Sequence, residues 1–393
     1  MMAPDAPICY AANAVAGYGG QGEFLRQMVY ALDQLPQARI LSRGAKATRA
    51  ECRDVPFDGL RRFTFRTISR LPAVRRRHDL LTLISDIDFD SRLSTHTADV
   101  KLFNSVMGQC CRTFELLSKK RMPLVLTALN THIDNVVEAL AEEYQRLNIP
   151  GRSFIHPSMQ QRVRREIECA SCVHAVSEAV KLSFIQRGVK PEKIQVVLPA
   201  VDLNYFHPVA KKDHIFRVLA VLTIDPRKGI YYLLKAFEQA AIPNSELVII
   251  GATGDRWSKQ LLQQYRGKLK NLRIQSADVL HDPIENTYGQ ASVFVHPAIE
   301  DGFALAVSQA LACGRPVITT RQTGAAQLIR DGQNGCVLEC RDVDGLIECL
   351  RMLARDQSLL ERLGAAAPTA VAHLGYRSFA QNMAQLYNRV LAS

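Results

Sequence analysis

The segment VFVHPAIEDGFALAVSQALACGRPVITT, residues 293–320, decides the fold of this chain. It starts with a short apolar run that ends at His296-Pro297 and continues through an acidic loop, Glu300-Asp301-Gly302. A stretch rich in small residues follows and leads through Cys313-Gly314 into a second apolar run. Apolar runs of strand length on either side of a helical stretch predict a strand–helix–strand unit with parallel strands.

The same alternation continues along most of the chain and forms two series. The predicted strands lie at 7–12, 99–104, 123–128, 172–176 and 194–198, then at 216–222, 246–250, 271–275, 292–295 and 316–319. We therefore predict an α/β fold with two Rossmann-like, doubly wound domains. The predicted boundaries are 1–198 for the N-terminal domain, 199–208 for a linker that begins and ends with proline, and 209–374 for the C-terminal domain. Residues 375–393 are predicted to form a helix that returns to the first domain.

The composition of the chain limits the classes of protein to which it can belong. Of the 393 residues, 47% are apolar and 22% are charged, which is typical of folded globular chains. No apolar run approaches the roughly 18 residues of a membrane span, and the segment 1–7 lacks a basic start followed by an apolar core, so we expect a cytoplasmic protein. The ten cysteines are expected to be reduced; Cys169 and Cys172 form an isolated CxxC pair, so no metal site is predicted.

Positive charge is concentrated in residues 41–80. The net charge of the chain is +11, and this stretch holds eleven basic against four acidic residues, including Arg75-Arg76-Arg77. The stretch is either a solvated surface or the contact for an anionic partner, such as phospholipid headgroups at the inner face of the membrane or a phosphorylated acceptor. It matches no nucleic-acid-reading module, so nucleic acid is not an expected partner.

A glycine-rich loop follows the first predicted strand. Gly17, Gly19 and Gly22 satisfy GxGxxG before a helix, as in dinucleotide-binding domains. Residues 13–16 separate Gly17 from the predicted strand, however, and Ser42-Arg43 occupies the place of the ribose-binding acid, which would at best suit NADP. A loop whose amides approach a phosphate or a sugar, at Gly19 and Gly20, and a purely structural turn are the other interpretations.

Two further motifs indicate an anion site in the C-terminal half. In VLAVLTIDPRKGIYYLLKAF, residues 218–237, Arg227-Lys228-Gly229 stands where a strand gives way to a helix. Cations at a helix start lie beside free backbone amides that also favour anions. A phosphate there would therefore be bound both by the cationic side chains and by the amides. Only Asp225 lies near Lys228 in sequence as an ion-pair partner. In the acidic loop, Asp301 is placed to accept hydrogen bonds from hydroxyls, and the amides of residues 303–305 could face a sugar or a diphosphate.

These residues carry a family resemblance. The segment 296–335, with the glycine loop, Ser177-Glu178 and the Pro-Arg-Lys-Gly turn, resembles the retaining glycosyltransferases of family 4, which have the GT-B architecture. The resemblance implies transfer of a sugar from a nucleotide-sugar to a hydroxyl of a glycan or lipid-linked acceptor, with no metal or other cofactor. It also implies that the departing phosphate serves as the base and that the configuration of the sugar is retained.

The resemblance also implies roles for individual residues. Lys228 would bind the donor diphosphate, Asp301 the sugar and Gln309 the ribose, while the strand end at His132 would lie near the reacting carbon. The implied catalytic residues are thus Asp301, His132 and Lys228, and the implied donor-binding residues are Gly19, Gly20, Arg227, Lys228, Phe303, Ala304, Leu305 and Gln309.

Three positions depart from the family pattern. Thr223 replaces an arginine, Asp301 replaces the first of two glutamates, and Gln309 replaces the second. Asp keeps the charge, and Gln can still bind hydroxyls through its amide group. Arg227 is the candidate to replace the missing cation.

Other functions remain open at this point. Asp86, Asp88 and Asp90 form overlapping DxD triplets, the metal-binding pattern of the GT-A fold, although a polar turn is the preferred interpretation. A GT-B-type epimerase or phosphorylase, an NADP-dependent oxidoreductase and an inactive scaffold, suggested by Thr223 and Gln309, are the remaining alternatives.

Overall fold

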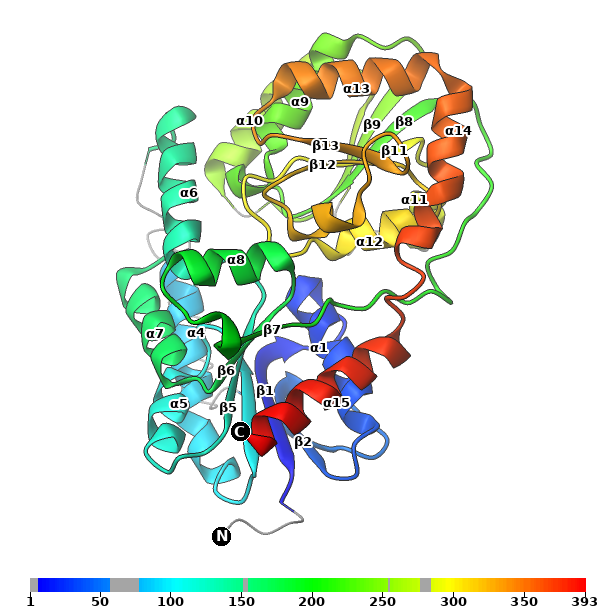
Figure 1. Ribbon diagram of the computed structural model, residues 1–393. Helices are drawn as coiled ribbons and strands as arrows, with labels where there is room; N and C mark the ends of the chain where they lie inside the picture. Colours follow the sequence, from blue (N-terminus) through cyan, green and yellow to red (C-terminus); the bar gives the residue numbers. More distant parts are fainter. Residues whose placement is uncertain (1–5, 57–77, 151–154, 254, 276–283) are drawn as a thin grey trace. The chain divides into compact units, whose positions relative to one another are not determined.

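The computed structural model describes residues 6–56, 78–150, 155–253, 255–275 and 284–393 (Figure 1). The chain divides into two compact units. The first unit contains Met1–Val137, Arg152–Ala200 and Tyr376–Ser393, and the second contains Glu138–Gly151 and Val201–Gly375. The predicted linker contains the passage from Ala200 to Val201, but the prediction did not anticipate that residues 138–151 group with the second unit.

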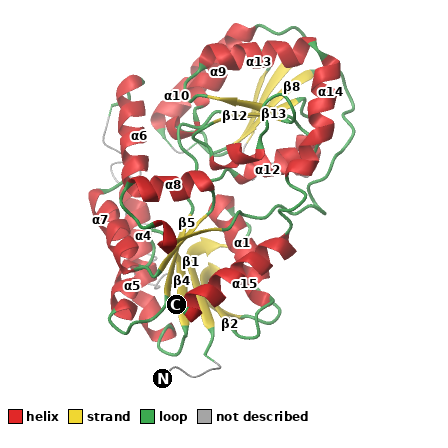
Figure 2. Ribbon diagram, in the orientation of Figure 1, coloured by secondary structure: helices red, strands yellow, loops and turns green. Residues whose placement is uncertain are grey.

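The first unit is built on a parallel sheet in the order β3-β2-β1-β4-β5-β6-β7. Its strands are β1 Ile8–Val15, β2 Ala38–Gly44, β3 Glu51–Asp54, β4 Leu102–Val106, β5 Leu124–Ala128, β6 Cys172–Ala175 and β7 Ile194–Val196. The helices are α1 Gly19–Asp33, α4 His78–Leu93, α5 Cys111–Ser118, α6 Ile133–Arg146, α7 Pro157–Cys169, α8 Glu178–Gln186 and α15 Tyr376–Ala392. Figure 2 shows the helices flanking the strands.

The C-terminal helix α15 completes the core of this unit. One apolar face of this helix is buried, with Phe379, Met383, Leu386, Tyr387 and Val390. The Phe379 ring meets Phe24 of α1 edge to face, with centroids 5.9 Å apart. Asn104 of β4 donates from Nδ2 to the Tyr387 hydroxyl at 2.8 Å. The helix is therefore held by apolar packing and by a buried polar contact.

The second unit has a parallel sheet in the order β10-β9-β8-β11-β12-β13. Its strands are β8 Phe216–Val221, β9 Ser245–Ile250, β10 Leu272–Gln275, β11 Val293–His296, β12 Val317–Thr320 and β13 Gly335–Leu338. The helices are α9 Ile230–Ala240, α10 Arg256–Lys268, α11 Ile284–Gln290, α12 Leu305–Ala312, α13 Val343–Arg355 and α14 Gln357–Ala366. Apolar residues of β8, β9, α9, α10 and α13 form one buried cluster.

The predicted strands are all present, and β2, β3 and β13 are additional. The two sheets and their flanking helices confirm the predicted two-domain α/β fold.

Candidate functional site

The candidate site lies where the strand order of the second sheet reverses. Strands β8 and β11 are neighbours, although β9 and β10 follow β8 on one side and β12 and β13 follow β11 on the other. In open parallel sheets, ligands bind beyond the carboxyl ends of the strands at such a point. The loops that leave β8 and β11 there contain the two predicted anion-site motifs, at 222–229 and 297–304.

The loop after β8 is shaped by a cap and a glycine. The Asp225 carboxylate accepts a hydrogen bond from the amide of Lys228 at 3.0 Å, and this closes a 3-10 turn over Pro226–Lys228. Gly229 follows with a φ of 69°, in the left-handed region. A Cβ atom at Gly229 would lie 1.8 Å from the carbonyl oxygen of Pro297, so only glycine lets the two loops approach this closely.

Two cation–carboxylate pairs join the loops. Lys228 Nζ contacts Asp301 Oδ2, and the two residues are each 8% exposed. Arg227 Nη1 donates to Glu300 Oε2 at 2.9 Å, and Glu300 is 4% exposed. Asp225, the acid nearest to Lys228 in sequence, is not its ion-pair partner. Asp225 caps a backbone amide, whereas Asp301, distant in sequence, pairs with the ammonium group.

A histidine supports the same carboxylate. The Nε2 atom of His296, the last residue of β11, lies 2.9 Å from Asp301 Oδ2. Burial by itself would raise the pKa of Asp301. The Lys228 charge and the His296 hydrogen bond outweigh burial and hold that pKa well below its usual value, so Asp301 is ionised.

The guanidinium of Arg227 is stabilised in a similar way. Burial opposes its charge, but the charges of Glu300, Asp225 and Asp301 together raise the pKa of Arg227. The site thus holds two fixed cations, each balanced by a carboxylate from the facing loop. An arriving anion could replace these carboxylates as the partner of each cation.

The acidic loop leads into α12 through a strained residue. Ala304 has a φ of 65° and precedes the helix, which has no side-chain cap within the described part of the chain. The amide of Phe303 faces Asp301 Oδ1 at 3.4 Å. Gln309 lies farther along α12, and its Oε1 atom accepts a hydrogen bond from the Tyr288 hydroxyl at 2.9 Å.

The predicted site residues therefore fall into separate groups. Arg227, Lys228 and Asp301 come together, with Phe303, Ala304 and Leu305 on the same loop and helix start. Gln309 instead accepts a hydrogen bond from Tyr288. Thr223 is exposed and supplies no cation. His132, Gly19 and Gly20 belong to the first unit.

Sequence reasoning missed the contacts of His296 and Glu300. Both residues lie in the segment that decides the fold. The contact of Glu300 with Arg227 becomes apparent only once β8 and β11 are known to be neighbouring strands, and the contact of His296 with Asp301 only once the loop after β11 is seen to fold back.

Close packing explains one glycine, Gly22, of the glycine loop in the first unit. A Cβ atom at Gly22 would lie 2.2 Å from the carbonyl oxygen of Val15, so Gly22 lets α1 pack against the end of β1. A Cβ atom at Gly19 or Gly20 would meet nothing within 4 Å. The expectation that residues 13–16 separate Gly17 from the strand was wrong, because β1 continues through a bulge to Val15.

The second condition for a dinucleotide site is still unmet. Arg43, near the end of β2, donates to Asn13 Oδ1 at 2.8 Å, to the Val55 carbonyl at 2.7 Å and to Asp88 Oδ2 at 3.1 Å. Because these acceptors occupy its guanidinium, Arg43 is a poor candidate for binding an NADP phosphate.

The DxD triplets lie in helix α4, which corrects the predicted polar turn. Asp86 accepts from Asn13 Nδ2 at 2.7 Å, and Asp88 from Arg43. Asp90 accepts from Arg162 at 3.0 Å and from the amide of Thr113 at 3.0 Å. Each carboxylate is thus buried against a protein partner and does not converge with the others on a metal. The described residues contain no cluster of three or more potential metal ligands.

His132 immediately precedes α6. It is buried, its Nδ1 atom accepts from the amide of Asp134 at 3.3 Å, and its ring meets Phe184 edge to face at 5.2 Å. The contacts orient the ring, and its predicted role near the reacting carbon stays a prediction.

Most of the basic stretch 41–80 lies outside the described residues. Within the described part, Arg43 is half-buried in the contacts above, while Lys46, Arg49 and Arg53 are exposed. No described helix has the length and apolar character to cross a membrane.

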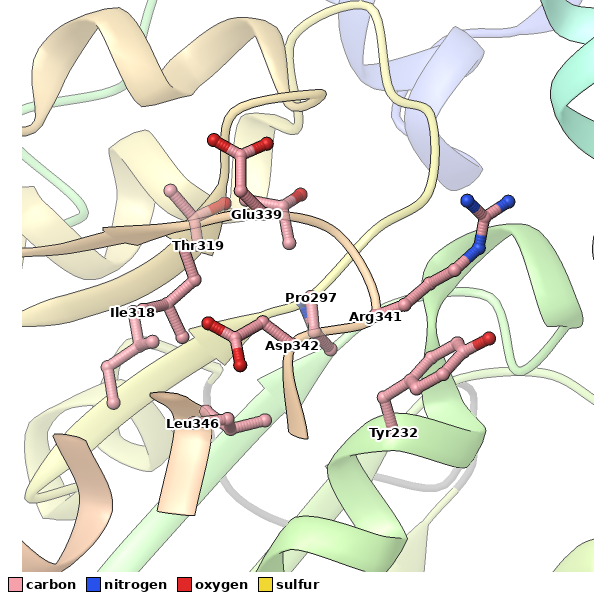
Figure 3. A pocket seen from close by; sticks show the side chains of 10 residues that line it. Tyr232, Pro297, Ile318, Thr319, Glu339, Arg341, Asp342 and Leu346 are labelled. Atoms are coloured by element: carbon pink, nitrogen blue, oxygen red, sulfur yellow. The ribbon is translucent and has the colours of Figure 1, made fainter. Parts of the chain in front are cut away.

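A small pocket lies near the carboxyl ends of β12 and β13 (Figure 3). Tyr232, Pro297, Thr319, Arg341 and Asp342 are among the residues that line it. Its lining includes neither Lys228 nor Asp301, so this pocket is separate from the paired cations.

Comparison with known proteins identifies the second unit. Residues 204–370 match the family described as glycosyl transferases group 1. The chain is 26% identical over 291 residues to MMP alpha-(1->4)-mannosyltransferase of Mycolicibacterium hassiacum, covering 72% of this chain and 70% of that protein. It is 22% identical over 346 residues to O-antigen chain mannosyltransferase B of Escherichia coli, covering 78% and 89%.

Solved structures show the same fold. Sucrose-phosphate synthase from Thermosynechococcus elongatus superimposes with a TM-score of 0.72 at 19% identity, covering 98% of this chain and 99% of that chain. Anabaena HepE in complex with UDP-glucose superimposes with a TM-score of 0.70 at 15% identity, covering 97% and 99%. The chain therefore has the GT-B fold.

Proposed function

We propose that the chain is a glycosyltransferase that moves a hexosyl-type sugar from a nucleotide-sugar to a hydroxyl of a glycan, with retention. The match of residues 204–370 to the glycosyl transferases group 1 family supports this proposal. The observation that carries the proposal is the pair of cations at the switch point of the second sheet, of which Lys228 is buried and Arg227 partly buried. Arg227 and Lys228 are fixed by their loop, and each forms an ion pair with a carboxylate of the facing loop. This arrangement suits a donor diphosphate.

In this proposal the second unit binds the donor. The diphosphate replaces Asp301 at Lys228 and Glu300 at Arg227, which compensates for the arginine missing at Thr223. As the bond between sugar and phosphate breaks, negative charge grows on the departing diphosphate, and preorganised cations stabilise that charge most effectively. Asp301, released from Lys228, is then able to accept hydrogen bonds from the sugar hydroxyls. No step requires a metal.

The first unit would bind the acceptor, with His132 near the reacting carbon. A lipid-linked or anionic glycan, used in the synthesis of a cell-surface polysaccharide or glycolipid, is supported by the basic stretch 41–80 and by the relative named as an O-antigen chain mannosyltransferase. The enzyme would then work in the cytoplasm, at the inner face of the membrane. The retaining outcome is supported by the resemblance of residues 296–335 to family 4.

The test begins with thermal denaturation in the presence of UDP, GDP, ADP and their sugars. A donor at 100 times its dissociation constant adds about 2.7 kcal/mol to the free energy of unfolding, so the correct nucleotide should give a clear shift. Lys228→Ala should remove this shift, and Thr223→Ala, a change of an exposed residue on the same loop, should keep it.

Turnover and the anomeric configuration of the product are then followed by NMR. Binding of a nucleotide-sugar without transfer or hydrolysis would support an inactive scaffold instead, and an inverted product would refute retention. A shift with NADP and none with any sugar nucleotide would refute the proposal.

A further inference from the structure

We propose that His296 is a positioning residue that keeps the Asp301 carboxylate in place when a donor diphosphate draws Lys228 away. This inference rests on the function proposed above and adds a residue that neither the sequence patterns nor the comparisons assign.

His296 is itself rigidly held. It is 2% exposed at the end of β11, and its carbonyl oxygen accepts a hydrogen bond from Thr319 Oγ1 of the neighbouring strand at 2.9 Å. Pro297 follows and restricts the backbone of His296 to extended conformations. The ring therefore has a fixed base from which to orient another side chain.

The tautomer of His296 follows from its contacts. An ionised carboxylate can only accept, so the proton must lie on Nε2, 2.9 Å from Asp301 Oδ2. The other nitrogen, Nδ1, is buried and has no hydrogen-bond partner among the described residues. Leaving a buried acceptor unsatisfied costs stability, and an apolar side chain would avoid that cost. The hydrogen bond that the imidazole donates to Asp301 offsets this cost.

The ring is neutral in this state. Burial lowers the pKa of His296; Asp301 opposes this change, whereas the charges of Lys228 and Arg227 add to it. A neutral imidazole has little attraction for a diphosphate, whereas the ammonium group of Lys228 has a strong one. Donor binding is therefore expected to remove the lysine from Asp301 Oδ2 and to leave the histidine there.

Without His296, Lys228 would be the one side-chain partner left to the Asp301 carboxylate among the described residues. The carboxylate would then either follow the lysine and compete with the diphosphate, or turn away from the sugar. In both cases, the affinity for the sugar portion of the donor should decrease more than the affinity for the nucleoside diphosphate.

The experiment compares two ligands and three variants by isothermal titration calorimetry. The ligand pairs are UDP-glucose with UDP and GDP-mannose with GDP, and the pair that binds the wild-type chain is used. His296→Leu removes the donor group at similar volume. In His296→Asn the amide nitrogen replaces Nδ1 and cannot reach Asp301, which gives a second loss variant if the leucine form does not fold. His296→Gln restores a neutral N–H donor near the position of Nε2.

The expected result is a selective loss. Both loss variants should bind the sugar nucleotide about tenfold more weakly, the effect of one hydrogen bond to a charged group, while binding the nucleoside diphosphate within about twofold of wild type. His296→Gln should recover most of the loss. Equal losses for both ligands, no loss for either, or no recovery in His296→Gln would overturn the inference but leave the proposed function standing. Absence of binding of every sugar nucleotide to the wild-type chain would overturn both.

Discussion

Replacing Lys228 by alanine should destabilise the second unit as well as impair turnover. The change removes the ammonium group from a contact in which both residues are almost completely buried, and it leaves the Asp301 carboxylate with His296 alone. Breaking a buried ion pair by removing one partner costs about 3–5 kcal/mol. For a unit of this size, each kcal/mol lowers the melting temperature by about 2–4 °C, so we expect a decrease of about 6–20 °C. Turnover should fall by a further factor of about 10² to 10³.

The assay is differential scanning calorimetry, because two units can unfold in separate transitions. Lys259→Ala, a change of an exposed lysine on α10, is the matched control and should change the free energy of unfolding by less than about 0.5 kcal/mol. The double variant Lys228→Ala/Asp301→Asn should recover most of the lost stability, because it no longer buries an unpaired charge.

The pH dependence provides an independent check. In the wild-type chain the pKa of Asp301 is lowered, so its contribution to stability is present above its unfolded pKa and is lost as the pH falls through the lowered value. In Lys228→Ala, burial is expected to raise that pKa, so the deficit should shrink as the pH falls from 8 to 5. An unchanged melting temperature in Lys228→Ala, or a double variant as unstable as the single one, would refute the assigned ion pair.

Three other predictions follow from contacts and charges described above. Asp301→Asn should reduce kcat/KM for the donor more than Gln309→Glu does, as steady-state kinetics would show; the reverse order would contradict the roles given to both residues. Burial raises the pKa of Asp86 to about 7. As the pH rises from the pKa of this carboxyl in the unfolded chain toward 7, the unfolded state loses the proton first, and the folded state becomes less stable. Asp86→Asn, which can still accept from Asn13, should therefore raise the melting temperature at pH 8 and change it less at pH 4. The chain should co-sediment with anionic liposomes in a salt-sensitive manner and lose this binding when Arg61, Arg62, Arg75, Arg76 and Arg77 are changed to glutamate; equal binding to neutral liposomes would refute the membrane prediction.

The periodicity of the sequence predicted most of the strands that are buried on both faces; β2, whose first five residues are buried, is the exception. β8, β9 and β11 are runs of apolar residues, so their pattern indicates a parallel sheet directly. The edge strand β3 (ECRD) has three exposed residues, and β13 (GCVL) has only four residues, so neither has enough apolar alternation to be recognised. Both strands are placed by pairing with a neighbouring strand, β3 with β2 and β13 with β12.

The contacts of the site were less predictable than its location. The cations at a helix start and the acid in a later loop could be identified locally, but the pairing of Lys228 with Asp301 depends on β8 and β11 being neighbours in the sheet. The helical position of Asp86 was missed for a related reason. Aspartate favours turns when its partners are unknown, whereas here Asn13 and Arg43 come from other strands to satisfy the carboxylates of α4.

Because α15 returns to the first unit, it affects the order in which the two units can finish folding during synthesis. The second unit ends at Gly375, whereas the first still lacks the residues that cover Phe24 and bond to Asn104. On a translating ribosome, the part that is made later can therefore finish folding before the part that is made first. Until residues 376–392 emerge, the nascent first unit exposes the apolar surface of α1, and this interval is when it is most open to chaperones and to aggregation.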